Sequence, residues 1–133
     1  MRRLRILKIP LGLIRKARRI LAGWLERFNR QPRWKAELLP DDNLPDDMPA
    51  LTVLVTHDDS EPWSAGLLCP CGCGDTIELP LFPEADQRWS IHINKQSRPT
   101  LHPSIWRKKG CRSHFFLREG LVMWCSDSRS LQN

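Results

Sequence analysis

The 133-residue chain contains no long hydrophobic run, and this absence excludes a membrane-spanning helix. Charged side chains recur every few residues even in its most apolar N-terminal part, residues 1–35. A secretory signal peptide is not expected there, because Lys8, Pro10 and Arg15 interrupt the apolar stretch and no cleavage site of small residues precedes the helical part. We expect a cytoplasmic protein, with peripheral attachment at the inner membrane surface as the alternative.

The sequence also lacks an even set of well-spaced cysteines. It has five, and Cys69, Cys71 and Cys73 stand at every second position. Cysteines two residues apart bridge poorly, and an odd total leaves one thiol over. Disulfides are therefore not expected, and the cysteines point to a metal site.

Acidic residues are scarce in the first part of the chain. Residues 1–35 carry twelve Lys or Arg and one acid, Glu26, which gives +11. The other residues carry nine basic and fourteen acidic side chains, which gives −5, so the two parts add up to the formal net charge of +6. Because the part expected to fold is acidic, nucleic-acid binding is not expected.

The basic N-terminal residues have the pattern of an amphipathic helix. Apolar residues recur at three- and four-residue steps from Leu13 to Phe28, and the basic residues fall largely on the other side. Such a helix can lie on an anionic membrane, fill a groove of a protein partner or dock on its own domain. These three alternatives stay open.

We divide the rest of the chain by composition. Residues 36–50 repeat Leu-Pro-Asp-Asp and predict a Pro/Asp-rich linker. Residues 51–126 contain short alternating segments, which predict strands, including a hairpin about Glu119-Gly120. Residues 127–133 form a tail. The predicted fold is mainly β: a small antiparallel, zinc-ribbon-like sheet stapled by one zinc site, with an N-terminal amphipathic helix.

The segment Cys69-Pro70-Cys71-Gly72-Cys73-Gly74 predicts one half of a zinc knuckle. Its glycines accept backbone angles that turn amide hydrogens toward sulfur. Cys111 and His114, three residues apart, predict the other half. Tetrahedral Zn²⁺ takes four of these five groups; Cys73, Cys111 and His114 are the surest, and Cys69 and Cys71 compete for the remaining place. Cys125 is interpreted as a small core residue.

Several blocks together carry a family resemblance. They are Leu68-Cys69-Pro70-Cys71-Gly72-Cys73-Gly74, Trp89, Thr100-Leu101-His102-Pro103-Ser104-Ile105, Cys111-Arg112-Ser113-His114-Phe115-Phe116 and Trp124. In this order they resemble a small bacterial family to which a zinc site is attributed, over roughly residues 50–126. Members are often encoded beside ubiquitin-like proteins and E1-like and E2-like conjugation enzymes. The resemblance implies a protein partner from a ubiquitin-like pathway, either the ubiquitin-like protein or a conjugation enzyme.

Ser104 leaves two interpretations open. A serine after proline on a turn can be a nucleophile when a free imidazole lies within hydrogen-bond reach, or it can cap the turn at Ile105-Trp106. Two functions follow. The first is a zinc-binding interaction module of the ubiquitin-like pathway. The alternative is a peptidase-like hydrolase that uses Ser104 on a ubiquitin-like protein or its conjugates.

Trp106 is followed by three basic residues, Arg107-Lys108-Lys109. The pattern favours a solvated basic loop before the second knuckle. A contact patch for an acidic or nucleic-acid partner is the weaker alternative.

Overall fold

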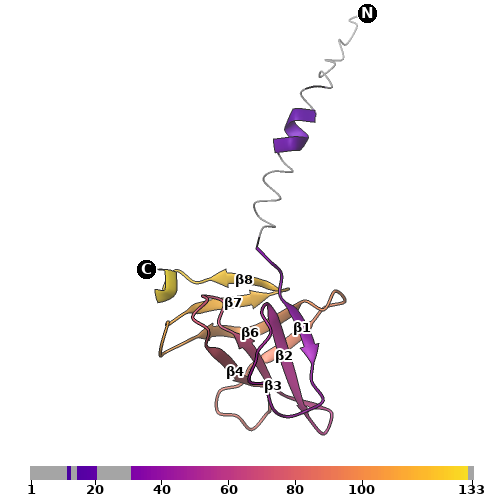
Figure 1. The fold of residues 1–133 in the computed structure, drawn as a ribbon, viewed down its shortest axis with the longest axis vertical. Helices are drawn as coiled ribbons and strands as arrows, with labels where there is room; N and C mark the ends of the chain where they lie inside the picture. Colours follow the sequence, from indigo (N-terminus) through magenta and orange to yellow (C-terminus); the bar gives the residue numbers. More distant parts are fainter. Residues whose placement is uncertain (1–11, 13–14, 21–30, 132–133) are drawn as a thin grey trace, which may run out of the picture. The chain divides into compact units, whose positions relative to one another are not determined.

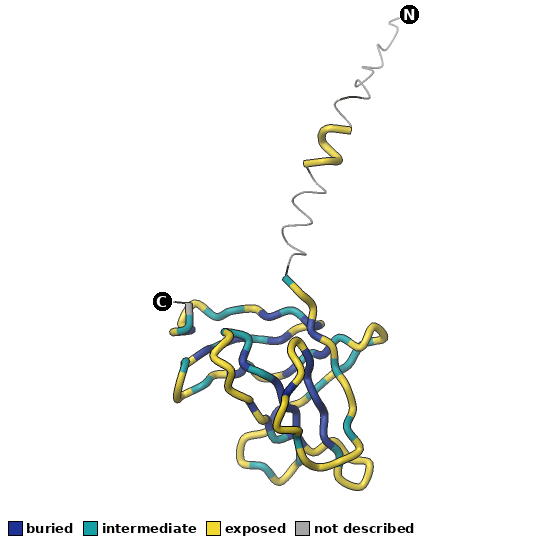
Figure 2. Tube along the Cα trace, in the orientation of Figure 1, coloured by how far each residue is buried: buried dark blue, intermediate teal, exposed yellow. Residues whose placement is uncertain are grey.

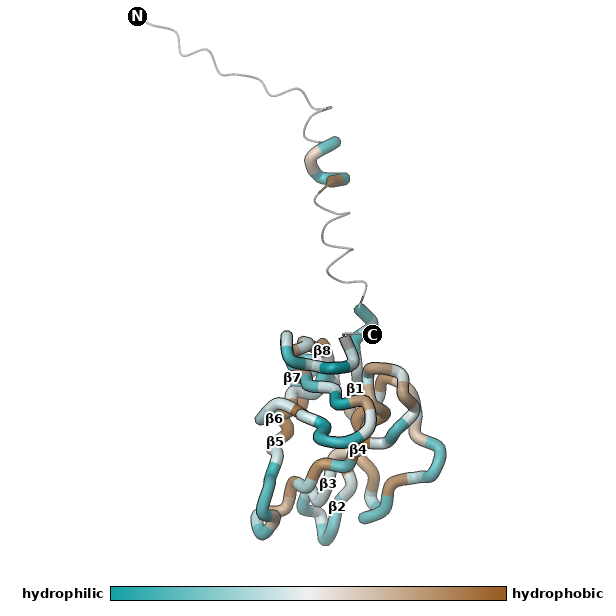
Figure 3. The backbone as a smooth tube through the Cα atoms, turned by 90° about the vertical axis from the view of Figure 1, so that its left-hand side faces the viewer, coloured by the Kyte–Doolittle hydropathy of each residue, from teal (hydrophilic) through white to brown (hydrophobic). Residues whose placement is uncertain are grey.

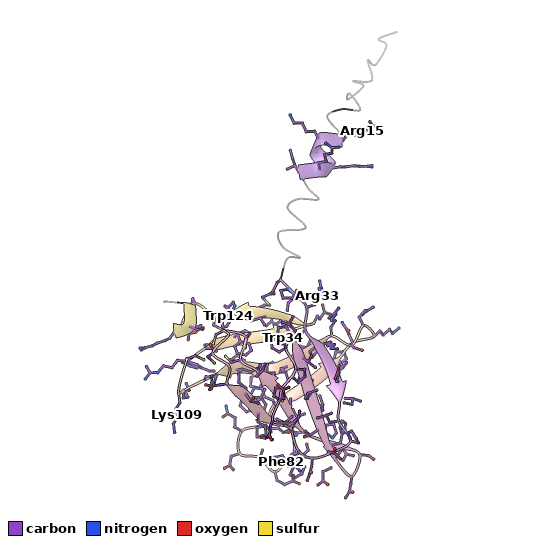
Figure 4. The ribbon with its side chains drawn as sticks, viewed as in Figure 1. Arg15, Arg33, Trp34, Phe82, Lys109 and Trp124 are labelled. Atoms are coloured by element: carbon purple, nitrogen blue, oxygen red, sulfur yellow. The ribbon has the colours of Figure 1, made fainter. Side chains whose placement is uncertain are left out.

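The computed structural model describes residue 12, residues 15–20 and residues 31–131. The chain divides into two units, Met1–Pro32 and Arg33–Asn133. In the first unit, residues 15–20 are helical and exposed, and their side chains are drawn around the labelled Arg15 (Figure 4). The remainder of the predicted amphipathic helix lies outside the described residues. No helix among the described residues is long and apolar enough to cross a membrane.

The second unit consists of two four-stranded sheets (Figure 1). The first sheet has the order β1-β2-β3-β4 and contains β1 (Lys35–Leu38), β2 (Thr52–Asp58), β3 (Glu61–Leu68) and β4 (Thr76–Pro80). The second has the order β5-β6-β7-β8 and contains β5 (Ser90–Ile93), β6 (Pro99–Trp106), β7 (His114–Arg118) and β8 (Leu121–Trp124). The mainly β class is confirmed, in two small sheets rather than one. One pairing, β1 with β2, is parallel.

Strand alternation builds a core shared by both sheets. In β4, exposed and buried residues alternate from Thr76 to Leu79, as expected for a sheet with one face packed on the core and the other exposed to solvent. The cluster includes Val53, Val55, Ala65 and Leu67 from the first sheet and Leu101, Ile105, Phe115 and Leu117 from the second. Figure 2 shows the buried segments along these strands, and Figure 3 shows the hydropathy of the residues along the same two sheets. The two sheets thus form one hydrophobic unit.

The Pro/Asp-rich segment is docked on the first sheet rather than free. Leu44 packs so closely on β3 that a Cβ at Gly66 would lie 2.4 Å from its Cδ1. Met48 is buried, and His57 Nδ1 lies 2.8 Å from the carbonyl oxygen of Leu39. The range predicted as a linker therefore contains most of β1 and lines the sheet.

Trp34, ahead of β1, joins the start of this unit to the β7–β8 hairpin. The indole is buried, and the Trp34 N–H donates to the carbonyl of Gly120 at 2.8 Å. Glu119 and Gly120 have φ values of 46° and 78°, and Arg118 pairs with Leu121, so the predicted hairpin is confirmed. Both sheets thus gain a contact from the chain before residue 50.

Candidate active site

Ser104 lies where β6 leaves its regular pairing with β7. Leu101 pairs with Leu117, but Ile105 pairs with Phe115, so β6 has two extra residues between the two pairs. Pro103 has no N–H for the ladder, which favours a bulge at this point. The bulge puts Ser104 on a half-buried surface of the sheet, and bulges often aim side chains at active sites.

His114, the first residue of β7, lies between Ser104 and Asp127. The Ser104 Oγ is 3.0 Å from His114 Nε2, and His114 Nδ1 is 2.6 Å from Asp127 Oδ1. The imidazole side chain is 13% exposed and the Asp127 side chain 52% exposed. Each ring nitrogen of His114 thus has one oxygen partner.

Backbone contacts on both sides of Asp127 hold the histidine in place. The Cys125 N–H donates to the His114 carbonyl at 2.9 Å, and the His114 N–H donates to Ser128 Oγ at 3.0 Å. Ser128 is fully buried, and its hydroxyl lies 2.9 Å from that of Ser130. The segment after β8 is therefore tied to the start of β7, which brings Asp127 to the imidazole.

Trp106 covers the imidazole on the same face of the sheet. Trp106 and His114 are register partners, and their rings stack with centroids 4.5 Å apart and planes 5° from parallel. Ser104 and Trp106 are two residues apart on β6, so both side chains point to the face that carries His114. The stack fixes the plane of the imidazole.

This arrangement defines the proton positions needed for nucleophilic catalysis. An ionised Asp127 carboxylate can only accept a hydrogen bond, so His114 Nδ1 is the donor. In the neutral imidazole Nε2 then has no proton and can accept the hydroxyl proton of Ser104. A serine, a histidine and a carboxylate in this relation can carry out acyl transfer.

A second group of side chains, the cysteine cluster, contains Cys69, Cys71, Cys73 and Cys111. Their four sulfurs lie within 4.8 Å of one another, and all four cysteines are free. The distances from Cys69 Sγ to Cys71 Sγ and Cys111 Sγ are 3.4 and 3.6 Å. A tetrahedral zinc with Zn–S bonds of about 2.3 Å holds its sulfurs about 3.8 Å apart. The cluster therefore fits a Cys₄ zinc site.

Hydrogen-bond donors around the sulfurs support negative charge there. Arg107 Nη1 donates to Cys111 Sγ at 3.1 Å and to Cys73 Sγ at 3.4 Å, and its Nη2 makes an ion pair with Asp75 at 3.0 Å. Burial raises the pKa of Cys69 to about 12. Burial would also raise the pKa of Cys111, but hydrogen bonds from Ser113 and the neighbouring thiols outweigh it and lower that pKa to about 6. Cys111 is thus ready to bind metal as a thiolate.

The predicted site residues fall into these two groups. The structure brings Cys69 and Cys71 into the cluster together, and it places His114 with Ser104 instead of with the four sulfurs. Asp127 lies in the segment predicted as the tail, and its position in a polar segment directly after the last strand is the one signal in the sequence that points to it. Cys125, predicted to be a core residue, is half-buried outside the core cluster, and its sulfur lies within 4.8 Å of the ligand atoms of His114 and Asp127.

Comparison with known proteins identifies a family. Residues 40–125 match the family described as the bacterial ubiquitination-like system serine protease, BubE. No curated protein and no solved structure matches the chain significantly. Since the matched residues make up more than half of the chain and include Ser104 and His114, the chain belongs to the BubE family.

Proposed function

We propose that the protein is a serine peptidase of a bacterial ubiquitination-like system, in which Ser104 is the nucleophile. The observation that carries this proposal is the hydrogen-bonded series Ser104–His114–Asp127, with distances of 3.0 and 2.6 Å. The description of the BubE family supports the reaction class and the pathway. A ubiquitin-like protein or its conjugates are the proposed substrates.

In this mechanism His114 Nε2 accepts the Ser104 proton while Oγ attacks the carbonyl carbon of the scissile amide. Asp127 stabilises the imidazolium that forms. His114 then donates the proton to the leaving amine, and the acyl group stays on Ser104. Water, deprotonated by His114, attacks this ester; His114 then returns the proton to Ser104 Oγ, and the acyl group leaves as the second product, a carboxylic acid.

The proposed Zn²⁺ would be held by Cys69, Cys71, Cys73 and Cys111. Its role would be structural: it would tie the loop that contains Cys111 to the end of the first sheet. Cys111 lies between Ser104 and His114 in the chain, in the loop that joins β6 to β7. Closing this loop on the first sheet would hold the nucleophile and the base in register. A site with four thiolates leaves no open position for water, so the chemistry is assigned to Ser104.

A Ser104 hydroxyl bonded only to backbone at a turn would favour the interaction module. An imidazole at 3.0 Å from its hydroxyl favours the peptidase instead. Protein binding remains part of the proposal, since the substrate is itself a protein.

The test is cleavage of the ubiquitin-like protein encoded beside this chain, as precursor and as conjugate, followed by mass spectrometry. The wild-type protein should cleave it and should be labelled on Ser104 by a fluorophosphonate. Ser104→Ala should abolish both, whereas Ser90→Ala, an exposed serine on β5, should abolish neither. Cleavage that persists in Ser104→Ala would overturn the proposal.

A further inference from the structure

Beside Ser104, His114 and Asp127, which we call the triad, lies a hollow of about 200 Å³ whose lining has more cations than acids. It is lined by Trp106, Arg107, Lys108, Arg112, Asp127 and Arg129. Two of these residues, Trp106 and Asp127, contact the imidazole of His114 directly. We call it the basic hollow; it opens beside the groups that would carry out the chemistry.

Three of its cations have no acidic partner. Arg107 is already engaged by Asp75 and the cysteine sulfurs. Lys108, Arg112 and Arg129 make no ion pair within the part of the chain that the structure describes. The one acid in the lining, Asp127, has its Oδ1 on His114. The hollow thus presents positive charge that the protein itself leaves uncompensated.

The position of this charge contrasts with the rest of the folded unit. Residues 36–133 carry nine basic and fourteen acidic side chains, yet six of the nine basic residues fall within residues 107–129, which contain only two of the acids. Lys108 also places its ammonium 3.2 Å from the centre of the Trp106 ring, so this cation is held over the residue that stacks on His114. A concentration of cations next to a nucleophile attracts an anionic part of the substrate.

We propose that the basic hollow is a specificity site that binds a carboxylate of the peptide substrate close to the scissile bond. This inference rests on the proposed peptidase function. Arg112 and Arg129 are the specificity-determining residues, because guanidinium groups match carboxylates in a two-point geometry, and Lys108 adds charge. The carboxylate comes either from an Asp or Glu side chain or from the C-terminus of the segment that is released.

The first experiment measures binding without turnover. Succinate is titrated into full-length Ser104→Ala protein, and the indole N–H signal of Trp106 is followed by NMR, with succinamide as the neutral control. Succinate should shift this signal to saturation, and succinamide should not. Arg112→Glu/Arg129→Glu should weaken succinate binding at least roughly tenfold, and Arg112→Gln/Arg129→Gln should weaken it in the same direction. Lys109→Glu is the matched control, because Lys109 is an exposed neighbour (Figure 4) and does not line the hollow.

The second experiment measures turnover with a peptide library read by mass spectrometry. Cleavage that depends on Ser104 should favour sites near a carboxylate, and the preference should fall in the Arg112/Arg129 variants but not in Lys109→Glu. Loss of the preference on amidating the C-terminus identifies the terminal carboxylate as the source, and loss on Asp→Asn or Glu→Gln exchange identifies the side chain.

The outcomes separate the two proposals. Ser104-dependent cleavage without any carboxylate preference would overturn the specificity site and leave the peptidase standing. Absence of all Ser104-dependent cleavage would overturn the peptidase and the substrate role of the hollow together. Failure of succinate to bind, or equal binding of succinamide, would also overturn the specificity site.

Discussion

The hydroxyl of Ser113 lies 3.1 Å from Cys111 Sγ, although Ser113 directly precedes the histidine of the triad. Ser113 is fully buried, and Cys69 Sγ donates to the same hydroxyl at 3.6 Å. The backbone carbonyl of Ser113 accepts from the Arg107 N–H at 2.8 Å. One residue therefore connects the cysteine cluster to the strand that carries His114.

Ser113→Ala should make zinc binding more sensitive to acid. Burial would raise the pKa of Cys111, but hydrogen bonds from the Ser113 hydroxyl and N–H, the largest lowering contributions, and from the neighbouring thiols lower it to about 6 from an ordinary value of 9.0. In the metal-free protein this thiolate stabilises the fold above pH 9, and the contribution is lost as the pH falls toward 6. Without the hydroxyl the pKa of Cys111 rises. Once it lies above 7, each further pKa unit lowers the apparent zinc affinity at pH 7 by about tenfold, because protons compete with zinc for this sulfur.

The measurement for this variant is competition for zinc with a chelator at several pH values between 6 and 9. The apparent affinity of Ser113→Ala should depend more steeply on pH than that of the wild type. Ser126→Ala, an exposed serine, is the control and should behave as the wild type does. Identical slopes for Ser113→Ala and the wild type would show that the hydroxyl does not control Cys111.

Asp127→Asn should leave the fold intact and remove most of the activity. An asparagine can donate to His114 Nδ1 and so favours the tautomer in which Nε2 carries the proton and cannot accept from Ser104. We expect kcat to fall by roughly ten-thousand-fold, as for the equivalent change in other serine peptidases. Asp86→Asn, an exposed loop residue, is the control; similar kcat values for the two variants would exclude Asp127 from the triad.

The intact protein should bind one equivalent of zinc. Cys111→Ser should lose the metal and lower Tm, whereas Cys125→Ser should keep both the metal and the Ser104-dependent cleavage. Elemental analysis and thermal unfolding test this. A second equivalent of zinc that disappears in Cys125→Ser would place a metal on His114, Cys125 and Asp127, and would contradict a free imidazole.

Gly120→Ala should destabilise the folded unit. At φ 78° a Cβ would lie 2.5 Å from the Trp34 carbonyl oxygen, and the backbone of Trp34 is fixed by its hydrogen bond to Gly120. Strain of about 2 kcal/mol lowers Tm by roughly 10 °C for a domain of this size. Gly12→Ala, where no atom lies within 4 Å of the added Cβ, should leave Tm unchanged. Equal Tm values for Gly120→Ala and the wild type would mean that the hairpin does not need this contact.

Deletion of residues 1–32 should leave Tm of the remaining protein unchanged, because the second unit begins at Arg33. Deletion through Leu38 should lower it, since buried Trp34 and strand β1 are lost. The basic segment should instead govern binding to anionic vesicles, and added salt should release it. Sedimentation of intact and shortened protein with such vesicles tests this. If the intact protein does not bind the vesicles at low salt, the basic segment binds a groove of a protein partner or its own domain instead.

Local patterns were sufficient to predict the β7–β8 hairpin, because alternation and turn residues act over a few positions. They did not reveal β3, where Pro62 and Gly66 resemble a turn, or β6, which carries Pro99 and Pro103. These strands form because cross-strand packing outweighs weak local preference.

The cysteine cluster could be anticipated from spacing, but the partner of His114 could not. Spacing alone puts His114 three residues from Cys111 and suggests a shared metal. In the structure the bulge in β6 brings Ser104 to one ring nitrogen and the turn after β8 brings Asp127 to the other. Both contacts depend on strand register and tertiary packing, which no local motif encodes.

The loop between β6 and β7 has a consequence for when the chain can bind a metal. This loop separates Ser104 from His114 in the sequence. Its Cys111 must meet the three cysteines of the β3–β4 loop, which precede it in the chain by the length of β4, β5 and β6. This long-range closure cannot precede the meeting of the two sheets. In a newly synthesised or partly unfolded chain whose two sheets have not met, the loop between Ser104 and His114 would therefore still be open at Cys111, and a metal could not yet close it.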